Sequence, residues 1–169
     1  EESEMHPAVF INEAHHVPRH RAFSIRLLRA LREKGFRYFA AETLSSFDQE
    51  LHTRGYPTRR TGYYTQEPQY GDLVREALSL GYTVIPYESE KGKCLFKPEE
   101  PSFCQNRRER AQAENLYERI YKKDPKAKLF LHAGYGHIDE FGMGGSTEGI
   151  HTTEWVPMAR YFKGLTGVD

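Results

Sequence analysis

Short apolar runs that alternate with amphipathic segments constrain this chain most. Four runs have the length and composition of strands buried on both faces of a sheet, at residues 8–11, 36–41, 82–86 and 128–131. Segments between them carry apolar residues at three- and four-residue spacing, which predicts helices over residues 21–34, 70–80 and 106–123. Strand–helix–strand units of this size are crossover connections, so we expect parallel strands.

This alternation predicts an α/β fold, with an open, mostly parallel sheet, helices on both faces and long loops at the C-terminal edge of the strands. At 169 residues, we expect a single domain spanning residues 1–169, and a mature or trimmed form of a longer chain. In the helix over residues 21–34, the apolar side, which includes Phe23, faces the core and the arginines face away. Residues 155–163 predict a last helix, with Pro157 in its first turn.

Two loops separate these elements and leave alternatives open. Residues 44–70 have no period, and a loop of this length is typical of a lid or binding loop. Its Tyr56, Tyr63 and Tyr64 either line a pocket or pack the loop onto the body. Cys94 and Cys104 lie in the second loop. A disulfide between them favours an exported protein, and two free thiols are the alternative.

The charge balance restricts the partners. Lysine plus arginine equal aspartate plus glutamate at 24 each, so charge indicates no nucleic-acid partner. No apolar run approaches the roughly 18 residues of a membrane helix, so we expect no membrane span. A small-molecule ligand or substrate is the partner that we expect.

Ionisable residues follow every predicted strand. The first strand is followed by Glu13, His15, His16 and His20, the second by Glu42, the third by Glu88, and the fourth by His132, Tyr135 and His137. The carboxyl ends of parallel strands meet at one edge, where open α/β sheets bind ligands. Buried carboxylates and imidazoles need partners, a metal or a function. We therefore expect these residues to converge on one site.

Such a set supports two chemistries. Glu13, His15, Glu42 and His137 are candidate ligands of a divalent metal in a mixed nitrogen and oxygen site, although no HExxH motif is present. Without metal, a histidine acts as general base toward water and the acids orient it. His16 in solvent and His132 as an interior histidine are the structural alternatives. A surface interaction domain with incidental histidines is a further one.

The glycine-rich turn at residues 134–136 is not a phosphate loop, because it lacks the GxxxxGK[ST] lysine. Its glycines instead let the backbone turn so that His137 points back toward the site. The sequence contains no GxSxG elbow and no suitably placed cysteine, so it does not indicate a covalent nucleophile.

Four motifs resemble one superfamily, that of the erythromycin esterases and ChaN-like haem-binding lipoproteins. They read NEAHHVPRH, AAET, RRERAQAEN and HAGYGHI, in the family's order. The chain departs from the family pattern at Asn12, where glycine is usual, and at Gln112, where methionine is usual. It also lacks the helical insertion of the esterases, which counts against a large macrolide substrate.

The resemblance implies one of two functions. In an esterase, His15 or His16 is the base, Glu13 and Glu42 support it, and Arg108 is an oxyanion or carboxylate partner. His137 is then a second acid/base or orienting group. From their places after the strands, we expect Glu88, His20, His132 and Tyr135 to bind the ligand. The ChaN-like branch instead implies haem binding at the bacterial envelope or periplasm, and a cytoplasmic location stays open.

Overall fold

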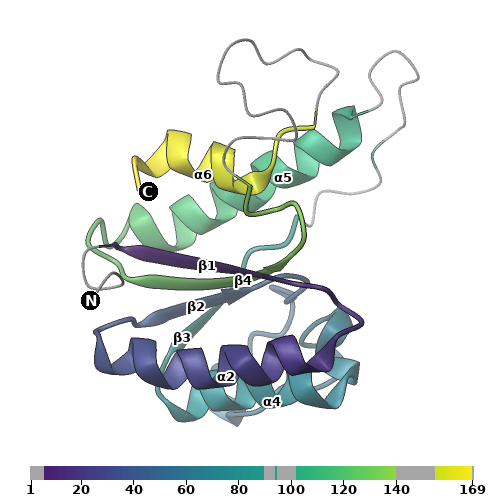
Figure 1. The fold of residues 1–169 in the computed structure, drawn as a ribbon, viewed down its shortest axis with the longest axis vertical. Coiled ribbons are helices and arrows are strands. Elements are labelled where there is room, and N and C mark those ends of the chain that lie inside the picture. Colours follow the sequence, from purple (N-terminus) through teal and green to yellow (C-terminus); the bar gives the residue numbers. More distant parts are fainter. Residues whose placement is uncertain (1–5, 90–93, 95–101, 140–154, 169) are drawn as a thin grey trace.

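A four-stranded sheet runs through the computed structural model, which describes residues 6–89, 94, 102–139 and 155–168 (Figure 1). The strands are β1 (Ala8–Glu13), β2 (Tyr38–Ala41), β3 (Thr83–Pro86) and β4 (Leu129–Gly134). All neighbouring strands are parallel, in the order β1-β4-β2-β3. The last strand therefore lies between the first two, and Phe130 is in register with both Val9 and Phe39.

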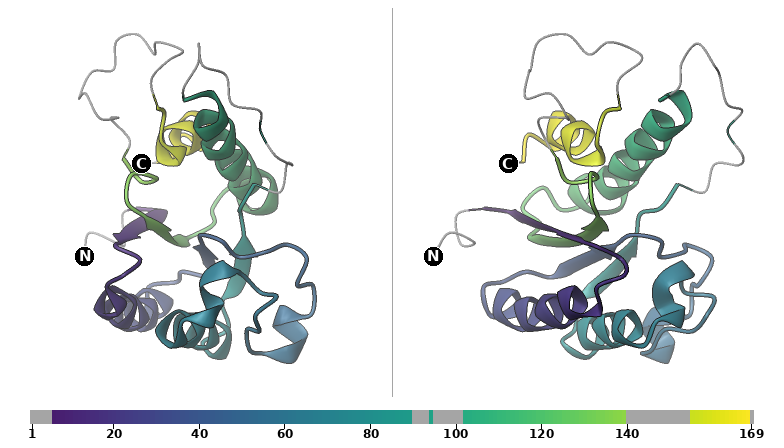
Figure 2. Two further views of the ribbon diagram at one scale, coloured as in Figure 1. Left: turned by 90° about the vertical axis from the view of Figure 1, so that its right-hand side faces the viewer. Right: turned by 45° about the vertical axis from the view of Figure 1, so that its right-hand side comes forward.

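Helices cover both faces of the sheet. α2 (Pro18–Glu33) and α4 (Pro68–Ser79) lie on one face, and α5 (Phe103–Leu116) and α6 (Met158–Thr166) lie on the other, as the views of Figures 1 and 2 agree. A π-helical segment, η2 (Tyr117–Tyr121), extends α5. The short helices α3 (Leu51–Arg54) and η1 (Tyr63–Gln66) lie between β2 and α4. The predicted α/β fold is confirmed.

Each face of the sheet has its own core, because successive residues of a strand point to opposite faces. Phe130 packs with Leu28 of α2 and Tyr70 of α4 in one core. Leu129 and Leu131 belong to the other core, which contains Leu116 of α5 and Phe162 of α6. The sheet is thus packed between two helical layers.

The faces of α2 differ from the prediction. Phe23 is 55 % exposed, whereas Arg21 is 1 % exposed. The helix begins at Pro18, three residues before the predicted start, and Arg21 lies in its first turn. The guanidinium is paired with the Glu13 carboxylate at the end of β1, and this pairing offsets the loss of hydration that would otherwise keep an arginine out of the interior.

Smaller differences concern the later helices. α5 begins three residues earlier than predicted, and α6 begins at Met158, so that Pro157 is the N-cap residue and precedes the first turn. The glycine-rich sequence of residues 138–153 also predicts a loop, and residues 140–153 of it lie outside the described residues.

Cys94 and Cys104 form a disulfide, with their Cα atoms 5.6 Å apart. The bond decides between the two alternatives that the sequence left open. Disulfides persist in oxidising compartments, so an exported location stays our prediction. Within the described part of the chain, no helix is long and apolar enough to cross a membrane.

Candidate active site

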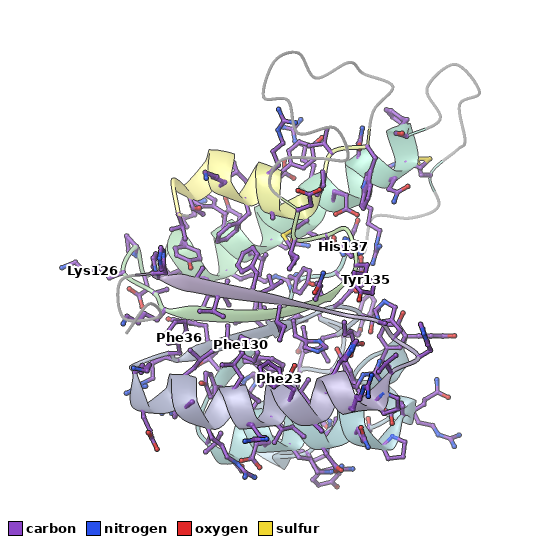
Figure 3. The ribbon with its side chains drawn as sticks, viewed as in Figure 1. Phe23, Phe36, Lys126, Phe130, Tyr135 and His137 are labelled. Atoms are coloured by element: carbon purple, nitrogen blue, oxygen red, sulfur yellow. A yellow bond between two sulfur atoms is a disulfide. The ribbon has the colours of Figure 1, made fainter. Side chains whose placement is uncertain are left out.

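The carboxyl edge of the sheet gathers most of the predicted site residues. Glu13 ends β1, Glu42 directly follows β2, Glu88 follows β3 by two residues, and β4 leads into His137. Figure 3 shows Tyr135 and His137 at this edge, at the opposite end of the sheet from Lys126. Because the strands are parallel, their ends bring residues from distant parts of the sequence together.

Glu13 holds His15 in one orientation. The Nδ1 atom of His15 lies 2.8 Å from Oε1 of Glu13. A carboxylate only accepts hydrogen bonds, so Nδ1 carries the hydrogen and Nε2 carries the lone pair in the neutral ring. Arg21 holds the same carboxylate through Nε and Nη2, at 2.8 and 2.6 Å. Burial by itself would raise the pKa of Glu13, but the hydrogen bond from Arg21 lowers it.

Glu42 lies at the centre of the cluster and accepts from three directions. Its Oε2 accepts a hydrogen bond from the Gly134 N–H at 2.7 Å. Its Oε1 accepts a hydrogen bond from Arg108 Nη2 at 3.0 Å. The same Oε1 lies 3.3 Å from His137 Nε2. Burial alone would raise its pKa, but the hydrogen bond with His137, followed by that from Arg108, lowers it to about 2. Glu42 is therefore ionised at neutral pH.

His137 lies between two carboxylates. Its Nδ1 is 2.8 Å from Oε2 of the buried Glu109, and its Nε2 faces Glu42. Both ring nitrogens must then carry hydrogens, so this ring is an imidazolium. Burial would lower its pKa, but the hydrogen bonds to Glu109 and Glu42 raise it to about 9. Arg108 Nη1 lies 3.4 Å from the same Nε2; two cationic donors cannot bond each other, so the shared Glu42 holds them together.

Arg108 connects α5 to the ends of β2 and β3. It donates to Glu88 through Nε at 2.9 Å and through Nη2 at 2.6 Å, and Nη2 also reaches Glu42. Its side chain is 37 % exposed and that of His15 is 35 % exposed, whereas Glu42 and His137 are buried. A molecule at the cluster therefore meets His15 and Arg108 first.

Two further residues fix the ring of His15. Tyr64 of η1 stacks on it, with ring centroids 4.3 Å apart. A Cβ at Gly134 would lie 2.5 Å from His15 Nε2 and 3.0 Å from Glu42 Oε2. Position 134 therefore needs glycine for close approach, whereas Gly136, with φ +89, is the residue that turns the backbone.

The remaining candidates lie around this cluster. His16 is exposed, and in the described part of the chain it has no contact with the cluster. His20 accepts a hydrogen bond from the Ala14 N–H through Nδ1 and supports the turn after β1. His132 is an interior histidine, with Nε2 at 3.4 Å from Glu13 Oε2, and burial lowers its pKa to about 4. Tyr135 is exposed.

The predicted metal ligands do not fit a metal ion. Among residues 6–89, 94, 102–139 and 155–168, no group of three or more histidine, cysteine, aspartate or glutamate side chains is placed to hold one. The carboxylates of Glu13 and Glu42 already bind the guanidinium groups of Arg21 and Arg108. The oxygens that would ligate a metal therefore already accept hydrogen bonds. Haem binding is not tested by any of these contacts and stays a prediction.

Three residues of the site were not predicted from the sequence. Arg21 was assigned to the exposed face of its helix, and Glu67 and Glu109 were not singled out. Glu67 accepts from Arg21 and caps α4, accepting from the N–H groups of residues 69 and 70. A strand-end acid followed by an arginine in the first turn of the next helix is the signal that identifies Arg21. Glu109 offers no such signal, because its partner His137 is distant in the sequence.

Comparisons with known proteins support the fold alone. The sequence matches no protein-family model and no curated protein. It is similar in structure to the type III effector HopBA1, with a TM-score of 0.57, 15 % identity and coverage of 86 % of this chain and 74 % of that chain. A structure of the group "bacterial protein toxins" has a TM-score of 0.62 at 16 % identity; it covers 95 % of this chain, which spans 33 % of that one. Neither name mentions erythromycin esterases or ChaN-like proteins, so that resemblance stays a prediction.

Proposed function

We propose that the protein is a hydrolase that cleaves an ester or amide bond of a small substrate without a covalent enzyme intermediate. The observation that carries this proposal is the Glu13–His15 pair. It leaves Nε2 of a half-exposed imidazole available, and both this ring and the half-exposed guanidinium of Arg108 approach the Glu42 carboxylate. An oriented base next to a hydrogen-bond donor is the arrangement that acyl transfer to water requires.

Each group has one role in the proposed reaction. His15 Nε2 takes a proton from water, and the resulting hydroxide attacks the carbonyl carbon. Arg108 Nη1, which no carboxylate engages in the described residues, donates to the oxygen that becomes negative. The bond from carbon to the leaving group then breaks, and the leaving atom takes the proton back from the imidazolium of His15.

Glu42 stabilises the charged form of His15 during this cycle. Its Oε2 is 3.6 Å from Nε2, which is too long for a hydrogen bond but close enough for attraction once the ring is protonated. His137 and Arg108 keep Glu42 ionised, so it is a positioning residue and does not compete with His15 for the proton. The likeness of the motifs to erythromycin esterases points the same way.

The test is hydrolysis of a panel of small esters and amides by the purified protein and by His15→Gln. A general base contributes about 10²- to 10⁴-fold, so we expect kcat/KM to fall by at least about 100-fold. His16→Gln is the matched control, since this neighbouring histidine is exposed, and we expect it to stay within about twofold of the wild type. A folded His15→Gln protein that retains most of the activity would refute the proposal.

A further inference from the structure

The charge of the cluster restricts its substrate. The groups that hydrogen-bond or ion-pair there are the carboxylates of Glu13, Glu42, Glu67, Glu88 and Glu109, the guanidiniums of Arg21 and Arg108, and the imidazolium of His137. Carboxylates outnumber cations in this set by five to three, so the paired groups of the cluster carry a net negative charge. Charges this close to a reacting group act at short range and within a partly buried environment, where salt screens them little.

Arg108 does not make the cluster an anion site. A guanidinium that binds phosphate or carboxylate presents a free fork to the ligand. Here Nε and Nη2 are already bonded to Glu88 and Glu42, so the fork is occupied and its charge is neutralised. Nη1 can still donate one hydrogen bond to a carbonyl oxygen, but a whole anionic group would face Glu42 and Glu88 as well.

Aromatic rings lie next to His15. Tyr64 stacks on its ring, and Tyr63 meets Tyr64 edge-on at 5.2 Å between centroids. Tyr135 directly follows Gly134, where a Cβ would lie 2.5 Å from His15 Nε2, and Figure 3 shows Tyr135 at the carboxyl edge of the sheet. Tyr63 is 73 % exposed and Tyr135 is 65 % exposed. Exposed tyrosine faces around a negative field attract organic cations through their ring quadrupoles.

We propose, building on the hydrolase function above, that the substrate carries a cationic group, such as an alkylammonium alcohol esterified to a small acyl group. The acyl carbonyl lies between His15 and Arg108, and the cation lies against the tyrosines of the rim. Anionic esters are rejected by Glu42 and Glu88.

Three thioesters of similar size test this inference: acetylthiocholine, its neutral isostere 3,3-dimethylbutyl thioacetate, and the anionic 2-sulfonatoethyl thioacetate. Released thiol can be followed with a thiol reagent, because both cysteines of the chain form a disulfide. We expect kcat/KM for the cationic thioester to exceed that for the anionic one by at least about tenfold, and this ratio to change little with ionic strength because the charges are partly buried. An anionic thioester that reacts as fast as the cationic one overturns the inference.

The Tyr135→Leu variant tests the rim, which consists of Tyr63, Tyr64 and Tyr135. Loss of one exposed cation–π contact should lower the ratio of cationic to neutral turnover by about two- to fivefold. Phe23→Leu is the matched control, because Phe23 is also an exposed aromatic residue but lies on α2, apart from Tyr135 in Figure 3. An unchanged ratio in Tyr135→Leu refutes the role of this residue.

Binding separates this inference from the proposed function. Choline and acetate are titrated into the wild-type protein, and the imidazole proton signals of the histidines are followed by NMR. We expect choline to shift the signal that is lost in His15→Gln and acetate to leave it unchanged. If no thioester is cleaved but choline alone binds, the hydrolase proposal fails and the charge preference stands. If acetate binds more tightly, the charge preference fails whatever the turnover.

Discussion

Close approach at a single residue positions the base. Gly134→Ala adds a methyl group that would lie 2.5 Å from His15 Nε2 and 3.0 Å from Glu42 Oε2. Both atoms are ends of side chains, so the side chains move and the strand does not. Misplacement of a catalytic group by about 1 Å lowers rates by about 100-fold, and we expect a loss of this order in kcat/KM with nearly unchanged thermal stability.

The control for this variant is Gly164→Ala. Gly164 lies within α6, and a Cβ there meets nothing within 4 Å. Alanine is the better helix former, so this change should leave activity unchanged and stabilise the protein slightly. The explanation is contradicted if Gly134→Ala keeps its activity, or if it unfolds the protein, since the second result would mean that the strand and not His15 gives way.

At the scale of elements, Arg21 ties α2 to the end of β1. The Arg21→Gln variant leaves the buried carboxylate of Glu13 without its bidentate partner. Removing one member of a buried ion pair costs about 3–5 kcal/mol, and we expect a loss of this size in the free energy of unfolding, measured with urea. Arg29→Gln, which breaks an exposed pair with Glu76 between α2 and α4, should have a much smaller effect. Equal effects of the two variants would show that the Arg21 pair contributes little.

Elements were more predictable than their arrangement. All four strands and the four longer helices follow from apolar runs and helical spacing, which are local properties. The order of the strands does not follow, because the placement of β4 between β1 and β2 depends on packing between distant segments. The same division holds in the site. Glu13, Glu42 and His137 were predicted from their places after strands, whereas Arg21 and Glu109 are recognised only by partners that the fold brings near.

The pH dependence of stability belongs to the whole molecule, because it sums buried groups on several elements. The pKa of His137 is raised from 6.5 to about 9, so its contribution is complete below pH 6.5 and is lost as the pH rises to about 9. The pKa of Glu42 is lowered to about 2, so its contribution is present above pH 4.5 and is lost as the pH falls toward 2. The pKa of His132 is lowered to about 4, so the folded state resists its protonation and loses stability as the pH falls from 6.5 toward 4.

These three effects place the maximum of the free energy of unfolding near pH 6.5, with losses on both sides. On the alkaline side, one imidazolium limits the slope to about 1.4 kcal/mol per pH unit. Urea unfolding between about pH 7 and 9 should show this decline in the wild type and in His16→Gln. In His137→Gln the decline should flatten, because the group that releases the proton is gone, even if the variant is less stable throughout. A decline of the same slope in His137→Gln would show that another group releases the proton. It would contradict the conclusion that His137 is an imidazolium between Glu42 and Glu109.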